Sequence, residues 1–399
     1  MSTLKTINVV HPSGAVNNIV NDNKGNIDIG GTVAMSSSFK RNRIINGNMA
    51  IWQRGTSFTG LSSTKQGYLA ADRFHFNCGS SGTGVFSVTR STDTPPGIGF
   101  PNSIRVQPTT AMFSVAPSSY TSIAYNVESY NVADLCYGTP YAKPLVLSFW
   151  VKSNVTGIIP GGIGQNAAIS LGRTFPFTYT IAAANVWQKI TVLIPGDTSG
   201  GVNINQSGIG LHINFFYLNI GSSYQNGTEN VWNTGTSPLN TNFIASGRTY
   251  TNMSASTSNY MQITGVQLEV GTKATPYEFQ IYSEQLMQCQ RYFWKTYNQE
   301  VAPGSGHSGP ITYSTYRTRS YVGSYGAAVV QFPVLMRIAP NVTLYNGLTG
   351  ALNSWYCSDN DLSVTASVGL VQDSAVTTES NNMVPNLTYF FHLLADAEL

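Results

Sequence analysis

The chain has 399 residues, of which Asp, Glu, Lys and Arg make up only 10%; an ordinary soluble domain carries about 25%. This composition excludes a highly charged disordered chain. It also excludes a helical bundle or coiled coil, because those folds need charged side chains on their solvent-exposed faces. The net charge is only +3 and the chain has no Lys/Arg cluster, so we expect no nucleic-acid partner. We also expect no membrane insertion, because no apolar run approaches the ~20 residues of a membrane span.

The residues that replace the missing charges favour strands and turns. The chain is rich in Gly (38 residues) and Tyr (22), with many Asn, Ser and Thr. Small polar residues favour turns and aromatic residues favour strands, so we predict an all-β protein of two or three domains. The four cysteines are widely spaced and form no C-x-x-C pair, so we expect neither a metal nor a cofactor. The first residues lack the apolar core of a secretory signal, which suggests synthesis in a cytosol.

Residues 1–41 are unlike a packed domain. Short strand candidates, Ile19-Val20 and Ile27-Asp28-Ile29, flank a turn-rich stretch, Asn21 to Gly25. Such a segment buries little apolar surface alone. We interpret it either as an extended arm that orders against sister chains or a larger particle, through Ile19, Val20, Ile27 and Ile29, or as a floppy terminus.

Residues 42–281 carry the clearest strand signals. Apolar residues alternate along 145–152, 190–194, 209–217 and 266–270, and Gly/Pro/Asn/Ser-rich turns separate these runs. Many antiparallel strands over this length predict a jelly-roll sandwich with elaborated loops.

Residues 282–296 form the one credible helix. Ser283 is placed to cap it, and Tyr282, Leu286, Cys289 and Phe293 recur with helical spacing along one face. A helix this short needs a packing partner. Two hypotheses follow: the face packs on its own sandwich, or it contacts other subunits about a symmetry axis.

The rest of the chain divides into a linker and a second domain. Residues 297–310 are rich in Gly, Ser and Pro and are predicted to be a linker. Residues 311–399 are again strand-like, with alternation at 362–368 and a closing strand over 389–394, and they suffice for a smaller β-sandwich.

The sequence offers no catalytic motif. Asp72 and Arg73 are interpreted as an ion pair at a strand start, and His75 alternates with Phe74 and Phe76 in that strand. Asp359-Asn360-Asp361 suits either a calcium ligand set or an exposed turn. Glycosidases use paired carboxylates, but nothing in the sequence selects a pair from the 18 present. We therefore predict that the protein is not an enzyme.

The aromatic residues point to a different kind of chemistry. Sugar rings stack on Tyr and Trp, and their hydroxyls bond to amides and hydroxyls. Two groups fit this use, although the second also fits plain sheet packing. They are Tyr224, Trp232 and Asn233, and Tyr313, Tyr316, Arg317, Tyr321 and Tyr325.

Several strings resemble phage tail-fibre and related virion proteins. The stretch Asn42 to Ser57 (NRIINGNMAIWQRGTS), followed by Ala70-Ala71-Asp72-Arg73-Phe74, is similar to the opening of a domain in that family. Residues 265–271 (GVQLEVG), 274–278 (ATPYE) and 284–293 resemble the end of that domain. Residues 332–340 and the tail Ala395 to Leu399 (ADAEL) resemble the C-terminal β domain that often follows.

The resemblance implies a jelly roll similar to carbohydrate-binding modules in a virion-attached, homotrimeric fibre. The expected function is structural and adhesive, namely attachment of a tail fibre to host surface polysaccharide or lipopolysaccharide, with the arm bound to other virion proteins. A capsid-decorating head fibre or minor virion protein is the first alternative, and a polysaccharide depolymerase the second. The matched residues imply architecture, so recognition loops are expected between them, over 155–260.

Overall fold

The computed structural model describes residues 41–79, 83–165, 172–200, 207–234, 248–306 and 325–399, and the backbone of four further short strands. Three of these strands, β1 (Val9–Val10), β2 (Asn17–Asn21) and β3 (Ile27–Asp28), form a small antiparallel sheet. The strands predicted around Ile19-Val20 and Ile27 are confirmed in β2 and β3, whereas Ile29 lies outside the described residues.

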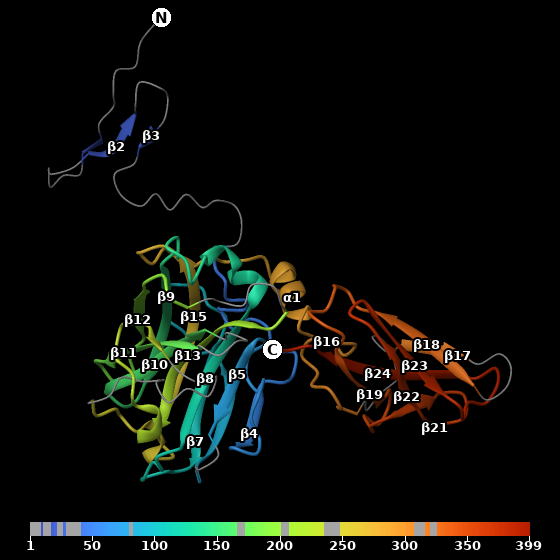
Figure 1. The fold of residues 1–399 in the computed structure, drawn as a ribbon. Coiled ribbons are helices and arrows are strands. Elements are labelled where there is room, and N and C mark those ends of the chain that lie inside the picture. The colour runs from blue at the N-terminus through green and yellow to red at the C-terminus, as the bar shows by residue number, and fades with distance from the viewer. Residues whose placement is uncertain are drawn as a thin grey trace, which may run out of the picture.

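The first large unit is a sandwich of two six-stranded antiparallel sheets (Figure 1). One sheet has the order β14-β11-β10-β13-β8-β5, with strands β5 (Phe74–Cys78), β8 (Tyr120–Glu128), β10 (Gly157–Gln165), β11 (Arg173–Ile181), β13 (Ile209–Ile220) and β14 (Asn233–Thr234). The other has the order β12-β9-β15-β7-β6-β4, with strands β4 (Ser57–Leu61), β6 (Val85–Ser91), β7 (Ser103–Thr110), β9 (Leu145–Ser153), β12 (Gln188–Ile194) and β15 (Met261–Val270). The chain passes repeatedly between the two sheets, as in a jelly roll. Short 3-10 turns, η1 (Ser129–Leu135), η2 (Ser222–Tyr224) and η3 (Met253–Ala255), lie in its connections.

The core of this sandwich follows from the predicted alternation. Leu145, Leu147 and Phe149 of β9 are fully buried and pair in register with Ile194, Val192 and Ile190 of β12. Because successive side chains point to opposite faces, every second residue enters the same core. The all-β jelly-roll prediction is therefore confirmed.

The predicted inward row on β13 is only partly confirmed. Register irregularities lie between Asn214 and Phe216 and between Tyr217 and Asn219. As a result Phe215 and Phe216, which are consecutive, both belong to the main core, while Tyr217 joins a separate aromatic cluster. An extra residue in one strand reverses the alternation beyond it.

The helix is shorter than predicted. Helix α1 spans Tyr282–Gln290 and begins after Ile281, so Ser283 does not cap it, and Phe293–Lys295 form strand β16. The predicted helix over 282–296 is thus wrong beyond Gln290. Pairing of β16 with the long strand β24 (Thr388–Asp396) satisfies the backbone there and buries Phe293, which decides against another helical turn.

The second unit is a smaller β-sandwich around β24. One sheet contains β16, β24 and four more strands, and the other has the order β18-β23-β22. These strands are β17 (Tyr316–Arg319), β18 (Gly326–Gln331), β19 (Asn341–Asn346), β20 (Ser354–Cys357), β21 (Leu362–Thr365), β22 (Ser367–Val371) and β23 (Ala375–Ser380). The closing strand predicted over 389–394 is confirmed in β24. The alternation predicted over 362–368 is confirmed for Val364, Ala366 and Val368, which face the second core, whereas Leu362 is exposed. The strand itself is interrupted at Ala366, where the chain passes from one sheet to the other.

The described part of the predicted linker is packed against this second sandwich. Tyr297 stacks on His392 with ring centroids 3.8 Å apart, and its hydroxyl accepts a hydrogen bond from the Gly304 amide. The second core starts at Trp294 rather than in the region predicted from residue 311. The two sandwiches therefore follow one another without a flexible spacer in residues 291–306.

The last residues of the chain return to the first sandwich (Figure 1). Glu398 forms ion pairs with Arg73 and Arg54, and Asp396 lies 3.2 Å from Arg54. Farther along the same junction Arg291 Nη2 lies 2.7 Å from Glu128 Oε1. These contacts join segments hundreds of residues apart into one interface.

Candidate functional site

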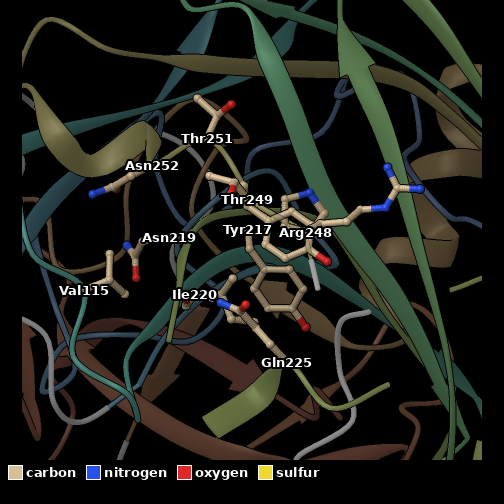
Figure 2. A pocket seen from close by; sticks show the side chains of 11 residues that line it. Val115, Tyr217, Asn219, Ile220, Gln225, Arg248, Thr249, Thr251 and Asn252 are labelled. Atoms are coloured by element: carbon tan, nitrogen blue, oxygen red, sulfur yellow. Dashed lines mark hydrogen bonds between the residues drawn. The ribbon is translucent and has the colours of Figure 1, made fainter. Parts of the chain in front are cut away.

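A pocket of about 280 Å³ opens at one end of the first sandwich, where β13 runs into η2. The segment Arg248 to Asn252 forms much of the remaining lining. In Figure 2, Asn219 and Asn252 lie at one end of this lining and the Arg248 guanidinium lies at the other. Eleven residues line the pocket: Val115, Pro160, Tyr217, Asn219, Ile220, Gln225, Arg248, Thr249, Tyr250, Thr251 and Asn252.

Aromatic rings form the floor of this pocket. Tyr217 and Ile220 build a small apolar cluster with Tyr120, Tyr224 and Tyr250. Tyr120 meets Tyr217 and Tyr224 edge to face, at centroid distances of 6.4 and 5.2 Å. Tyr217 reaches this position because the irregularities in β13 turn it away from the main core.

Internal hydrogen bonds fix the amide side chains of the wall. Asn219 Nδ2 donates to Ser254 Oγ at 2.7 Å and to Thr121 Oγ1 at 3.0 Å. Asn252 Nδ2 donates to the Met112 carbonyl, while its Oδ1 accepts from the Ser254 amide and caps η3. The wall is thus ordered before any ligand arrives, which reduces the entropy lost on binding.

The pocket is electrically balanced. Among the described residues that line it, Arg248 is the one with a charge, and the Arg248 Nε lies 2.7 Å from Glu229 Oε2. Burial, helped by Glu229, raises the pKa of Tyr250 to about 12, so its hydroxyl stays protonated near neutral pH. The arrangement offers ring faces, hydroxyls and amides without a net charge, which suits a neutral polar ring.

The first predicted aromatic group is divided by the structure. Tyr224 lies in η2 beside the pocket, and the Tyr120 ring lies between it and Tyr217. Trp232 instead packs against Tyr137 and Phe175 and donates its indole N–H to the Pro195 carbonyl. Asn233 stabilises the loop that precedes it. Its side-chain amide accepts a hydrogen bond from the Thr228 N–H and donates to the Thr228 and Val231 carbonyls.

The second predicted group belongs to the C-terminal sandwich and does not line this pocket. Tyr325 is 53% exposed and its hydroxyl donates to Glu379 at 3.0 Å. For Tyr316 and Arg317 the structure gives the backbone of β17, and Tyr313 and Tyr321 lie outside the described residues.

The predicted subunit-contact residues do not share one helix face. Cys289 and Phe293 are buried within the chain, and Phe293 lies in β16 rather than in the helix. Tyr282 is 51% exposed, and Leu286 is partly exposed. Of the four, Tyr282 and Leu286 are therefore accessible to a second chain.

The polar residues near the start of β5 have structural partners. Asp72 accepts hydrogen bonds from the Gln53 amide and side chain, whereas Arg73 pairs with Glu398, so the predicted Asp72–Arg73 ion pair is wrong. His75 and His212 lie side by side and bond to Asn77 and Asn126. In the part of the chain that the structure describes, no three His, Cys, Asp or Glu side chains gather to hold a metal. No described helix is long and apolar enough to cross a bilayer.

No family model matches the chain, and no curated protein matches it. Among solved structures, the enzymatically active domain of tailspike protein 4 of bacteriophage CBA120 is 11% identical, with a TM-score of 0.29 over 58% of this chain and 22% of that one. A putative sugar binding protein from Bacteroides thetaiotaomicron is 10% identical, with a TM-score of 0.30 over 58% of this chain and 100% of that one. A family 11 carbohydrate-binding module of a Clostridium thermocellum cellulase is 14% identical, with a TM-score of 0.26 over 51% and 90%. The fold assignment rests on the sheet topology rather than on these scores.

The sequence did not single out Tyr217 and Tyr250. Tyr217 belongs to an alternating row that indicates a core position. It is indeed buried, but the irregularity in β13 turns it from the main core toward the pocket. Tyr250 belongs to no recognisable sequence motif. The one useful signal was its place within 155–260, where the sequence predicts recognition loops.

Proposed function

We propose that this protein is a structural and adhesive fibre of a phage virion, a tail fibre, and that the pocket around Tyr217 and Tyr250 binds a neutral sugar of a host surface glycan. The observation that carries the binding part is the pocket itself, with its aromatic floor, fixed amides and balanced charge. This lining matches what a sugar ring offers, namely apolar C–H faces and many hydroxyls.

The fibre part rests on different support. The stretch Asn42 to Ser57 and the chain around α1 carry the sequence resemblance to virion fibres. Two consecutive β-sandwiches and a small separate sheet at the N-terminal side suit a chain with one end for attachment and another for contact. We propose homotrimers, docking of the N-terminal segment on other virion proteins, and a location on the released particle. Three copies would also strengthen weak sugar binding through avidity.

Glycan binding is tested with one variant and one matched control. An array of bacterial surface polysaccharides identifies a ligand, and calorimetry compares Tyr250→Ala and Tyr141→Ala with the unmodified chain. We expect Tyr250→Ala to weaken binding by about tenfold or more, because a central aromatic contact carries much of the affinity of such sites. Tyr141 is 82% exposed and outside the pocket, so its variant should bind normally. Equal affinity for all three proteins, or no ligand on the array, would contradict the proposal.

The location is tested on phage particles that carry this chain. Immunogold labelling at the tail would support a tail fibre, whereas labelling over the capsid would favour the head-fibre alternative. Mass photometry of the purified chain tests the assembly: a trimer supports the fibre, and a monomer at micromolar concentration contradicts it.

We further propose binding without cleavage. The Glu229 carboxylate beside the pocket is held by Arg248 and Thr178, so it acts as a structural partner. Elsewhere in the first sandwich, Asp197 is likewise held by Arg173 and Gln165. Incubation with the bound polysaccharide should release no reducing ends. Their appearance would revive the depolymerase alternative.

A further inference from the structure

A second pocket, of about 350 Å³, lies on another part of the molecule, between the segment 42–45, η1 and the end of α1. It shares no lining residue with the pocket around Tyr217. Six of its side chains carry the argument below: Arg43, Tyr130, Asn131, Asp134, Gln288 and Arg291.

One wall of this second pocket is cationic. Arg43 donates to the Asn131 carbonyl and to Asp134 Oδ2, but its Nε is buried and has no hydrogen-bond acceptor among the described residues. A buried N–H without an acceptor is unfavourable, so this atom favours a ligand that brings an oxygen. Arg291 is held in place by two hydrogen bonds to Glu128 and is one-third exposed.

The charges around this pocket do not cancel. Among the described residues that form ion pairs here, three cations meet two carboxylates: Arg43 and Lys143 pair with Asp134, and Arg291 pairs with Glu128. The Glu128 carboxylate is buried and also accepts from the Tyr292 hydroxyl, so it is fully occupied. One positive charge is left over, which favours an anionic ligand.

The facing wall is suited to a hydroxylated ring. Tyr130 is 55% exposed, and the side chain of Asn131 has no hydrogen-bond partner among the described residues. Gln288 donates its amide N–H to Gln280, which leaves its carbonyl oxygen as an acceptor for a hydroxyl. An aromatic face beside amide groups is the usual environment of a bound sugar.

We propose that this second pocket binds an acidic sugar unit, a uronate, with its carboxylate toward Arg43 and its ring on Tyr130. The proposal goes beyond the neutral-sugar pocket and does not depend on it. Asp134 occupies Arg43 in the absence of ligand and therefore competes with the incoming carboxylate.

The test is titration of the full chain with D-glucuronate, D-glucose and acetate, followed by NMR or calorimetry. We expect glucuronate to bind in the millimolar range, more weakly as NaCl rises, and neither glucose nor acetate to bind comparably. Tyr130→Ala should weaken glucuronate binding about tenfold, equivalent to about 1.4 kcal/mol. The matched control Tyr141→Ala, at an exposed tyrosine that lines neither pocket, should leave it unchanged.

A second variant tests the competition directly. Asp134→Asn removes the internal carboxylate, so glucuronate should bind about two- to fivefold more tightly, the range that an exposed ion pair is worth. This gain cannot arise from damage to the fold. Absence of glucuronate binding, equal binding of acetate, or no tightening in Asp134→Asn would each overturn the proposal. None of these results bears on the Tyr250 pocket, whose own test is separate.

Discussion

Arg73 carries its charge in the interior of the protein. It is 1% exposed, adopts a left-handed backbone conformation with φ of 74°, and lies over the Tyr292 ring at 3.5 Å. Its guanidinium is paired with Glu398 and donates to the Asn126 carbonyl. A buried charge that loses its partner typically costs 3–5 kcal/mol, so this one residue ties the stability of the first sandwich to the last residues of the chain.

Beside Arg73 lie two histidines that cannot easily accept a proton. Burial, with the neighbouring His212, lowers the pKa of His75 to about 3, and burial lowers the pKa of His212 to about 4. The unfolded chain, with histidine pKa near 6.5, therefore binds more protons than the folded chain in this range. The two histidines stabilise the fold fully above about pH 6.5, and this contribution is lost as the pH falls toward 4.

We predict that His212→Gln reduces the acid sensitivity of the protein. Urea unfolding at pH 7 and pH 4.5 should show a loss of stability in the unmodified chain that is about 2 kcal/mol larger than in the variant. Glutamine does not titrate but keeps a donor for Asn126, so it serves as a matched replacement. Identical pH profiles would show that His212 is not the responsible group.

At the scale of elements, glycines decide how closely strands pack. Gly161 of β10 faces Phe177 of β11, and a Cβ built on Gly161 would lie 2.5 Å from the Phe177 ring and 2.9 Å from the Asn214 carbonyl oxygen. Gly164, in the same strand, would place its Cβ 3.8 Å from Thr174, an ordinary contact. The Phe177 ring therefore leaves no space for a side chain at position 161, whereas position 164 has space for one.

We predict opposite effects for two identical substitutions in β10. Gly161→Ala should destabilise the protein by about 1–3 kcal/mol through overpacking, whereas Gly164→Ala should stabilise it by about 0.5 kcal/mol because glycine weakens a strand interior. Urea denaturation of both variants checks this. Similar effects for the two would mean that the Phe177 ring moves aside.

Strands with a regular pattern of apolar residues were predictable from the sequence. The points at which a strand becomes irregular or a helix ends were not. Strands β9 and β12 follow from their alternating apolar residues, and β24 follows from the run of aromatic and apolar residues over 389–394. The irregularity in β13 and the end of α1 depend on distant partners, Ser122 and Thr121 of β8 and the strand β24. For the same reason the sequence alone places Tyr217 in the main core and pairs Arg73 with its neighbour Asp72 instead of with Glu398, 325 residues away.

Across the whole molecule, a chain with few charges places many of them at one junction. Among the described residues, five ion pairs join the first sandwich to residues beyond 290. They are Arg54–Asp396, Arg54–Glu398, Arg73–Glu398, Arg90–Glu300 and Glu128–Arg291. The Gln53 side chain adds a hydrogen bond of 2.9 Å to the Phe293 carbonyl. The two sandwiches are therefore expected to unfold together.

We predict that removal of residues 396–399 uncouples the two sandwiches. Calorimetry of the full chain should give one unfolding transition, and the shortened chain should give two, because Arg73 and Arg54 lose their carboxylates. Glu300→Gln, which removes a pair whose carboxylate is 75% exposed, is the control and should retain one transition. Two transitions already in the full chain would contradict the coupling.

The return of the last residues to the first sandwich also has a mechanical consequence. The second sandwich is attached at more than one place, through the chain between α1 and β16 and, separately, through the contacts of Asp396 and Glu398. A body held at one point can swing, whereas a body held at two points resists bending. A sideways load on the second sandwich is thus shared between the Arg73–Glu398 contact and the chain at β16, and the two sandwiches are expected to move as one stiff unit.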